Sequence, residues 1–271
     1  MRNLKRTFAI ISSLLIVVSC SKEDSVSTSA DEWGTASFDC SMLSSVSCTT
    51  RSSDLYYIPE DLIPATDDIV LKITGSYIDS ESSETTSYSY GPLSLSTYNT
   101  SQPMMIASAD YNAQFWWGTA GTEGEAAPYF SGETDFEVIA RGDTTEEVSL
   151  VLQNSIITVE FDEMFENYYS DALFTISTGS GNSFDFSAET TDKIVFVEAS
   201  TNLTLSGSAT KTRDGSSVTF NAAVIGQTTA QTLSRINITA NSIGGENINI
   251  TVDETITEME PTQIELNPQG N

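Results

Sequence analysis

The sequence predicts an all-β protein with β-sandwich architecture and one short helix in its C-terminal half. Three observations predict this class. Apolar residues alternate with polar ones in many short runs, as expected for strands with one buried face. Glycine-containing turn signals separate these runs, and Ser and Thr are frequent whereas helix-forming runs are scarce. Many short strands joined by regular turns are typical of sandwiches.

The alternation of period two is clearest in the second half of the chain. Its inward positions are predicted to be Phe136, Val138 and Ala140; Leu203 and Leu205; Val218, Phe220, Ala222 and Val224; Ile236, Ile238 and Ala240; and Ile248, Ile250 and Val252. Turns are predicted at Gly91-Pro92, Gly179–Gly181, Asp214-Gly215 and Gly244-Gly245. Asp214-Gly215 is the clearest hairpin signal, because both residues tolerate the positive φ of a type I′ turn.

One longer apolar run changes its inward face along its length. Inward side chains fall on even positions in Val148–Leu152 and on odd positions in Ile157–Phe161. Because side chains alternate strictly along a strand, this switch requires a bulge or a change of face. We interpret the run as a strand that leaves one core and enters another. The predicted junction lies just before it, which gives domains at 34–142 and 143–271.

The predicted helix follows this strand directly. Asp162 can accept the N-cap hydrogen bond of a short helix. Phe165, Tyr168 and Tyr169 then have the i, i+3, i+4 spacing of one helix face. Alternation resumes over residues 172–176, so the second domain is predicted to begin strand, helical turn, strand.

The first 20 residues have the pattern of a bacterial lipoprotein signal. A basic head at residues 2–6 precedes an apolar run at 8–18. The run is shorter than the roughly 20 residues that span a membrane, which indicates a secretory signal peptide over residues 1–19. The end of this segment together with the following cysteine, Val17-Val18-Ser19-Cys20, resembles a lipobox. That resemblance implies a thioether lipid on Cys20 and cleavage before it.

An acidic tether is predicted after the lipobox, over residues 20–33. Ser21-Lys22-Glu23-Asp24 resembles the surface-export signal of lipoproteins from a phylum of Gram-negative gut and oral anaerobes. The alternative is a simple solvated tether. Two or three acyl chains, palmitate among them, hold a lipoprotein firmly because each buried methylene adds about 0.8 kcal/mol. We therefore expect an outer-membrane protein that faces the cell exterior.

The charge balance excludes several classes of function. The chain carries 11 basic and 38 acidic residues, a formal net charge of −27, and no histidine. Such a surface repels phosphate backbones, so no nucleic-acid partner is expected. Without imidazole, the common general bases, catalytic triads and zinc ligands are missing. We predict no enzyme activity, no catalytic or metal-binding residue and no cofactor. Calcium stays open because it takes oxygen ligands, although no Asp-x-Asp-x-Asp-Gly loop is present.

The two cysteines after Cys20 and the densest aromatic group each have two possible interpretations. Cys40 and Cys48 either form a disulfide outside the cytoplasm or are two small buried thiols. Tyr111 and Trp116 belong to the densest aromatic group of the chain. They are a candidate ligand platform for sugars, and the alternative is that they are core residues. On a strand Trp116 points away from Phe115 and Trp117, so at least one of these rings is expected in the core.

Several segments in this order resemble the fimbrillin-related surface lipoproteins of Bacteroidetes. They are Gly34–Asp39, Thr49–Arg51, Pro128–Val138, Val148–Phe161 and Val252–Ile256. The resemblance implies two consecutive β-sandwich domains, transthyretin-like or Greek-key, in a lipidated precursor. Fimbrillin precursors are cut after a basic residue, which releases an N-terminal strand and opens a groove for a strand of the next subunit. By this resemblance Arg51 is a candidate maturation site; the alternative is an ordinary surface arginine.

We therefore expect a surface-exposed lipoprotein that acts in cell adhesion as a fimbrial subunit, a tip or accessory component, or an adhesin. The alternative is a glycan-binding accessory lipoprotein of a nutrient-uptake system. The expected partners are the membrane through the lipid anchor, other fimbrial subunits through strand addition, and host or dietary glycans or proteins. A terminal strand packed over a groove would favour the first function. An exposed Trp116 in a cleft would favour the second.

Overall fold

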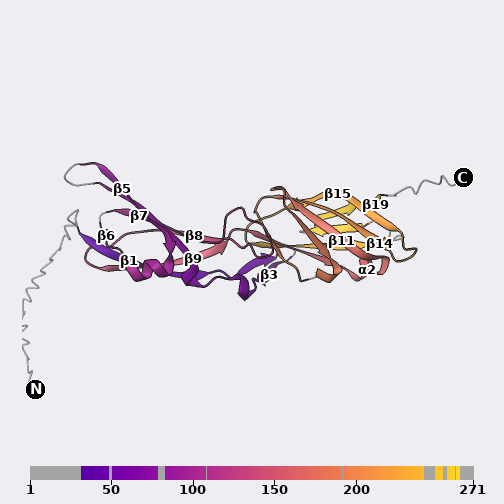
Figure 1. The fold of residues 1–271 in the computed structure, drawn as a ribbon, viewed down its shortest axis with the longest axis horizontal. Helices are drawn as coiled ribbons and strands as arrows, with labels where there is room; N and C mark the ends of the chain where they lie inside the picture. Colours follow the sequence, from indigo (N-terminus) through magenta and orange to yellow (C-terminus); the bar gives the residue numbers. More distant parts are fainter. Residues whose placement is uncertain are drawn as a thin grey trace, which may run out of the picture.

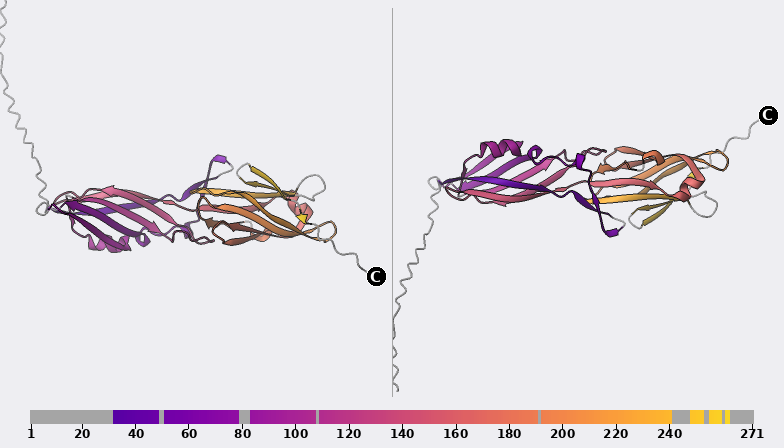
Figure 2. Two further views of the ribbon diagram at one scale, coloured as in Figure 1. Left: turned by 90° about the horizontal axis from the view of Figure 1, so that it is seen from above. Right: turned by 90° about the horizontal axis from the view of Figure 1, so that it is seen from below.

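The computed structural model describes residues 32–48, 51–78, 83–107, 109–190, 192–240, 248–252, 255–259 and 261–262 of the 271-residue chain. This part is an elongated molecule made mainly of strands (Figure 1). It contains two hydrophobic cores. The strands form two bundles that follow one another along the long axis in all three views (Figure 2). The predicted all-β class is confirmed. Within the described residues, no helix has the length and apolar character needed to cross a membrane.

The first core is enclosed by one seven-stranded sheet of order β5-β4-β7-β8-β9-β1-β6. Its strands are β1 (Trp33–Met42), β4 (Val70–Ile78), β5 (Thr85–Ser94), β6 (Met105–Ile106), β7 (Asp110–Trp117), β8 (Phe130–Phe136) and β9 (Asp143–Leu152). The sheet curls over on itself. The contact between Phe38 of β1 and Phe115 of β7, whose ring centroids are 5.1 Å apart, shows this. These strands are three places apart in the sheet order, so its two halves face each other like the layers of a sandwich.

One short helix and two helical turns complete the first half. Helix α1 (Leu95–Ser101) buries Leu95 and Tyr98 in the first core. Its N-cap is Ser94, whose hydroxyl oxygen accepts a hydrogen bond from the Thr97 N–H at 3.3 Å. The turns η1 (Glu60–Leu62) and η2 (Thr66–Asp68) lead into β4. The sequence did not predict α1, because two apolar residues in a Ser- and Thr-rich segment give little helical periodicity.

The second core lies between two facing sheets. One has the order β13-β10-β16-β17-β18, with β2 paired to β16 and β3 paired to β2. The other has the order β12-β11-β14-β15-β19. The strands of the first are β2 (Ser45–Cys48), β3 (Arg51–Tyr57), β10 (Ser155–Phe161), β13 (Val195–Val197), β16 (Thr232–Ala240), β17 (Ile248–Val252) and β18 (Thr255–Met259). Those of the second are β11 (Tyr169–Thr178), β12 (Ser183–Ser187), β14 (Asn202–Lys211), β15 (Ser217–Gln227) and β19 (Pro261–Thr262), with the turn η3 (Ala188–Thr190) after β12.

The change of inward face predicted near residue 153 is confirmed. Val148, Leu150 and Leu152 of β9 lie in the first core, whereas Ile157 and Val159 of β10 lie in the second. The junction itself was predicted before Asp143, but β9 pairs with β8 and β1 inside the first sheet. We therefore propose that the two units divide after Leu152.

The predicted helix is α2 (Glu163–Tyr168), capped as expected. The Asp162 carboxylate accepts a hydrogen bond from the Phe165 N–H at 2.7 Å. Phe165 and Tyr169 are buried and stacked, with ring centroids 5.0 Å apart. Tyr168 is 38% exposed, so this member of the predicted helix face lies outside the core.

The turn predictions had mixed outcomes. The Gly179–Gly181 turn joins β11 to β12, and the Asp214-Gly215 turn joins β14 to β15. Of the latter pair Gly215 has a positive φ of 71°, and Lys211 N–H bonds to Ser216 O at 2.8 Å, so the loop is longer than the predicted type I′ turn. The Gly91-Pro92 turn was wrong, because both residues lie inside β5 where the register with β4 shifts. Gly244-Gly245 lies outside the described residues.

Candidate functional site

The outward face of the first sheet is polar across several strands. On β7 the side chains of Tyr111 and Phe115 are buried, whereas Gln114 is exposed and Trp116 is partly exposed. This follows from the strict alternation of side chains along a strand. The predicted division of the aromatic group between core and surface is therefore correct for Phe115 and Trp116.

A hollow of about 550 Å³ lies on this face next to Trp116. We call it the Trp116 groove. Its polar walls are formed by Gln114, Tyr129, Ser131, Glu133, Ser149 and Gln153. The register explains how they meet, because Gln114 pairs with Glu133 and Trp116 pairs with Ser131.

The floor of the Trp116 groove lies where β8 approaches β9. Their ladder pairs Phe130 with Leu152 and Ser131 with Val151. A Cβ at Gly132 would come 2.6 Å from the Ser149 carbonyl oxygen, which real Cβ atoms do not tolerate. Glycine is therefore required at position 132 to let the two backbones come together. Apart from Trp116 itself, no sequence pattern indicates this groove.

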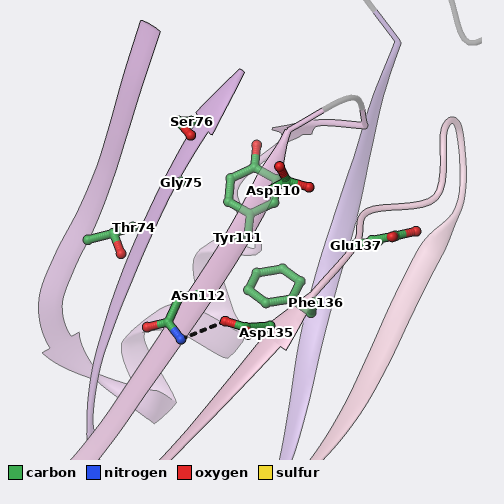
Figure 3. A pocket seen from close by; sticks show the side chains of 9 residues that line it. All are labelled: Thr74, Gly75, Ser76, Asp110, Tyr111, Asn112, Asp135, Phe136 and Glu137. Carbon is green, nitrogen blue, oxygen red and sulfur yellow. Dashed lines mark hydrogen bonds between the residues drawn. The ribbon is translucent and has the colours of Figure 1, made fainter. Parts of the chain in front are cut away.

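A second hollow, of about 590 Å³, lies further along the same face (Figure 3). Side chains of β4, β7 and β8 line it, and Asn112 Nδ2 donates a hydrogen bond to Asp135 Oδ1 at 2.8 Å. Asp110 and Glu137 give it an acidic rim. Among the residues that the structure describes, no group of three or more His, Cys, Asp or Glu could hold a metal ion.

Tyr111 is buried, which corresponds to the interpretation of this residue as a core residue, and it also lines the second hollow. It is 3% exposed and stacks on Phe136 with ring centroids 5.2 Å apart. Its hydroxyl accepts a hydrogen bond from the Ile106 N–H at 3.0 Å and lies 3.2 Å from the Ile106 carbonyl, to which it donates. Burial raises the pKa of this phenol above its ordinary value, and the Ile106 hydrogen bond opposes part of that rise. Tyr111 thus ties β6 to β7.

Strand β1 lies next to the edge of the first sheet, where the two-residue strand β6 pairs only with Trp33 and Gly34. It runs parallel to β9 from Thr35 to Met42 and antiparallel to β6 at its start. The Phe38 ring contacts the rings of Tyr98, Phe115 and Phe136 at centroid distances of 5.5, 5.1 and 5.2 Å. β1 therefore closes the first core as well as the sheet.

The segment after β1 crosses to the second core. The Ser47 N–H donates to the Gln231 carbonyl at 3.1 Å, and β2 runs parallel to β16. Arg51, the candidate maturation site, is the first residue of β3 and pairs with Cys48 of β2. Cys20, the predicted lipidation site, lies outside the described residues.

Cys40 and Cys48 are free thiols in the structure, both partly buried. Of the two interpretations left open, this arrangement corresponds to separate thiols. Burial, and secondarily the neighbouring Asp39 carboxylate, raise the pKa of the Cys40 thiol from 9.0 to about 11. A thiol with so high a pKa is a poor nucleophile at neutral pH.

The loop between β7 and β8 forms a latch onto the second half of the molecule. Glu123 Oε2 accepts hydrogen bonds from Thr178 Oγ1 at 2.7 Å, Ser180 Oγ at 2.6 Å and Asn182 Nδ2 at 2.8 Å. Its Oε1 accepts from the Glu198 N–H at 2.9 Å. Burial alone would raise the pKa of Glu123, but these hydrogen bonds outweigh it and lower the pKa below its ordinary value.

Other contacts reinforce the Glu123 latch. Gly124 and Phe196 exchange two backbone hydrogen bonds of 2.9 Å, and Lys193 pairs with Glu125 at 2.7 Å. Buried Asn154 accepts from the Tyr129 N–H at 2.6 Å. Sequence reasoning missed the latch, because nothing distinguishes Glu123 from the other acids of so acidic a chain.

The comparisons with known proteins give a family and several similar structures. A family model described as a domain of unknown function, DUF4493, matches residues 45–268. No curated protein matches the chain.

The similar solved structures share low sequence identity with the chain. A proposed cell adhesion protein of Bacteroides eggerthii is 10% identical, with a TM-score of 0.42, over 86% of this chain and 97% of that one. A proposed polysaccharide-binding protein (DUF1812) of Bacteroides thetaiotaomicron is 10% identical, with a TM-score of 0.38, over 86% and 99%. The fimbrial anchor protein Mfa2 of Porphyromonas gingivalis is 11% identical, with a TM-score of 0.32, over 82% and 98%.

The family match extends from β2 to beyond the last described strand, and so includes nearly all of the second core and most of the first. The chain therefore belongs to the DUF4493 family.

Proposed function

We propose that this chain is a lipid-anchored protein of the outer-membrane surface with a role in cell adhesion, as a fimbrial subunit, a tip or accessory component, or an adhesin. The observation that carries the proposal is the position of β1. A strand that precedes the others in the described part of the chain, pairs along most of its length with one neighbour, β9, and fills the core is a strand that another chain could replace.

Removal of β1 would leave a groove suited to strand addition. β9 would lose its parallel partner over the positions that pair Thr35–Met42 with Asp143–Leu150. The rings that contact Phe38 would lose that contact, and unpaired backbone groups beside an apolar slot are a template for an extended strand. A donor strand with apolar residues at every second position would restore both the ladder and the core.

The candidate site for such a removal is Arg51. A cut after it would separate β1, β2 and the first residue of β3 from the rest of the chain, and the remainder of β3 would lose β2, its partner in the sheet. The order β1, β2, Arg51 therefore supports maturation by proteolysis. The names of the similar structures, which include a fimbrial anchor protein and proposed adhesion proteins, agree with this role.

Lipid anchoring would orient the molecule on the cell. β1 begins at the end of the first core that lies farthest from the second core (Figure 1). A tether from Cys20 that enters there would place the first core near the membrane and the second core away from it. The large negative charge would keep such a crowded surface soluble.

The proposal is tested on the form of the protein found on cells. If the lipidated chain is the precursor of a polymerising subunit, mass spectrometry should recover no peptide from residues 20–51, and gels should show an SDS-resistant ladder. The Arg51→Ala variant should keep the N-terminal segment and lose the ladder, whereas Lys22→Ala, a basic residue of the tether, should behave as wild type. An intact N-terminus without a ladder would reject the polymerising subunit and leave a tip component or adhesin. Protein found free in the cytosol with an uncut signal would reject the whole proposal.

A second candidate function is that of a glycan-binding accessory lipoprotein of a nutrient-uptake system. It is favoured by one observation, the partly exposed Trp116 in a polar groove. The two functions share the predicted anchor and surface location, and they differ in whether the outer face of the first sheet has a ligand.

A further inference from the structure

We propose that the Trp116 groove is a binding site for an uncharged saccharide. The inference deepens the second candidate function and rests on its premise that this face is outside the cell. Three properties of the groove indicate this class of ligand: its aromatic platform, its hydrogen-bonding walls and its charge.

The platform is the indole of Trp116. Core aromatics of β7 point inward, whereas Trp116 lies on the outward face between Val70 of β4 and Ser131 of β8. Trp116 is partly exposed on this face and lines the groove, so part of its ring can contact a ligand. The C–H face of a pyranose packs on such a ring and gains apolar burial without losing its hydroxyl hydrogen bonds.

The walls of the groove carry both hydrogen-bond donors and hydrogen-bond acceptors. Gln114 and Gln153 supply amides, Glu133 a carboxylate and Tyr129 a phenol. A sugar hydroxyl both donates and accepts, so a mixture of amide and carboxylate groups matches it better than either alone.

The groups at the centre of the groove are available to a ligand. In the part of the chain that the structure describes, the side chains of Gln114 and Glu133 have no hydrogen-bond or ion-pair partner. Gln153 Nε2 donates to the Val151 carbonyl at 3.2 Å, which orients its amide and leaves the side-chain carbonyl oxygen as an acceptor.

The charge of the groove selects against anions. Among the described residues that line the groove, Glu133 is charged and none is Lys or Arg. Lys72 pairs with Gln114 from β4 but is not part of the lining. Sialylated, sulfated or uronic-acid sugars would therefore bring negative charge to a carboxylate on a protein of net charge −27. A neutral oligosaccharide carries no such cost.

Backbone hydrogen bonds fix part of the groove wall before any ligand binds. The Gln153 N–H donates to the Tyr129 carbonyl at 2.8 Å, and the Tyr129 N–H donates to buried Asn154 at 2.6 Å. These bonds fix two wall residues at the junction of the molecule. Its volume of about 550 Å³ lies within the range of small-ligand sites, and a rigid site loses less entropy on binding.

The test uses the full-length chain purified in detergent. The probes are neutral trisaccharides of glucose, mannose and galactose, with sialyllactose and a sulfated galactose trisaccharide as anionic counterparts. Tryptophan fluorescence and titration calorimetry report binding. At least one neutral probe should bind and the anionic ones should not. Trp116→Ala should weaken binding by at least about tenfold, and Trp116→Phe should keep part of it.

Controls separate a lost site from a lost fold. Trp33→Ala removes an exposed tryptophan of β1 outside the groove and should bind as wild type. Glu133→Gln removes the charge from the groove and should narrow the difference in affinity between neutral and anionic probes. Failure of every neutral probe, or full binding by Trp116→Ala, would overturn the inference. Surface exposure on cells without saccharide binding would overturn this inference alone, whereas binding by a protein found in the cytosol would overturn the proposed function alone.

Discussion

The Glu123 carboxylate accepts a hydrogen bond from the backbone N–H of Glu198 at 2.9 Å. One residue comes from the β7–β8 loop of the first core and the other follows β13 of the second. With Thr178, Ser180 and Asn182 also donating to Glu123, a single side chain joins two segments of the second core to the first. An ionised acceptor makes stronger hydrogen bonds than a neutral one, so this residue is well suited to fix the junction.

Glu123→Gln should therefore destabilise the protein. The amide nitrogen cannot accept the hydrogen bonds that one carboxylate oxygen receives, and the charge that strengthens the remaining bonds is lost. We expect a loss of about 1–2 kcal/mol in the free energy of unfolding, kept modest by the partial exposure of the site. Denaturant unfolding monitored by tryptophan fluorescence measures it.

Glu125→Gln is the matched control for this prediction. It changes the same residue type two positions along, where the side chain is 64% exposed and pairs with Lys193. Exposed ion pairs contribute little, so its effect should stay below about 1 kcal/mol. An equal loss in both variants would show that the Glu123 hydrogen bonds do not hold the junction.

The lowered pKa of Glu123 also predicts an acid sensitivity of the junction. A carboxyl group whose pKa is lower in the folded than in the unfolded protein stabilises the fold above its unfolded pKa. That contribution is lost as the pH falls through the folded pKa, which lies below the ordinary value of 4.5. The stability difference between wild type and Glu123→Gln should therefore be largest at neutral pH and shrink below pH 4.5.

Thermal unfolding of both proteins over a pH series measures this difference. Because many other carboxyl groups titrate in the same range, the absolute stability of each protein is not informative, and the difference between the two is. A difference that is constant with pH would mean that Glu123 acts through shape rather than through its charge.

Local patterns in the sequence predicted the parts of the fold that depend on interactions between residues close together in the chain. Asp162 and Phe165 define α2 through one cap hydrogen bond and one buried ring. The parity change between Leu152 and Ile157 located the passage from one core to the other. Neither feature needs a distant partner to be recognised.

Features that depend on distant partners were missed or misplaced. The junction was placed before Asp143 because the sequence does not say that β9 pairs with β1. On β15, Val224 was expected inward but is 66% exposed, because register shifts against β14 turn the strand over and bury Ile225. Of the two platform residues, Trp116 is on the surface and Tyr111 is in the core, as alternation on one strand requires.

The Cys40 thiol should react slowly with alkylating reagents. The thiolate is the reactive form, and a pKa of about 11 in place of 9.0 lowers its population at neutral pH about 100-fold. Mass spectrometry of the peptide that contains Cys40 should show slow labelling by iodoacetamide in the folded protein and fast labelling in urea. The folded rate should rise with pH until about pH 11. Labelling at the same rate in both states would contradict the burial of this side chain.

Phe38 tests the role of β1 in closing the first core. It is 3% exposed and its ring contacts three other aromatic rings. Phe38→Ala should reduce the free energy of unfolding by about 3–5 kcal/mol, because the cavity it leaves is bounded by rings that cannot collapse into it. Asp39→Ala changes the next residue of β1, which points outward, and should cost less than about 1 kcal/mol.

If β1 is a replaceable strand, a synthetic peptide with the sequence of Trp33–Met42 should restore the stability of Phe38→Ala, whereas the same peptide with Ala in place of Phe38 should not. Equal effects of the two peptides would show that β1 is a fixed part of the fold and would remove the structural basis for strand exchange.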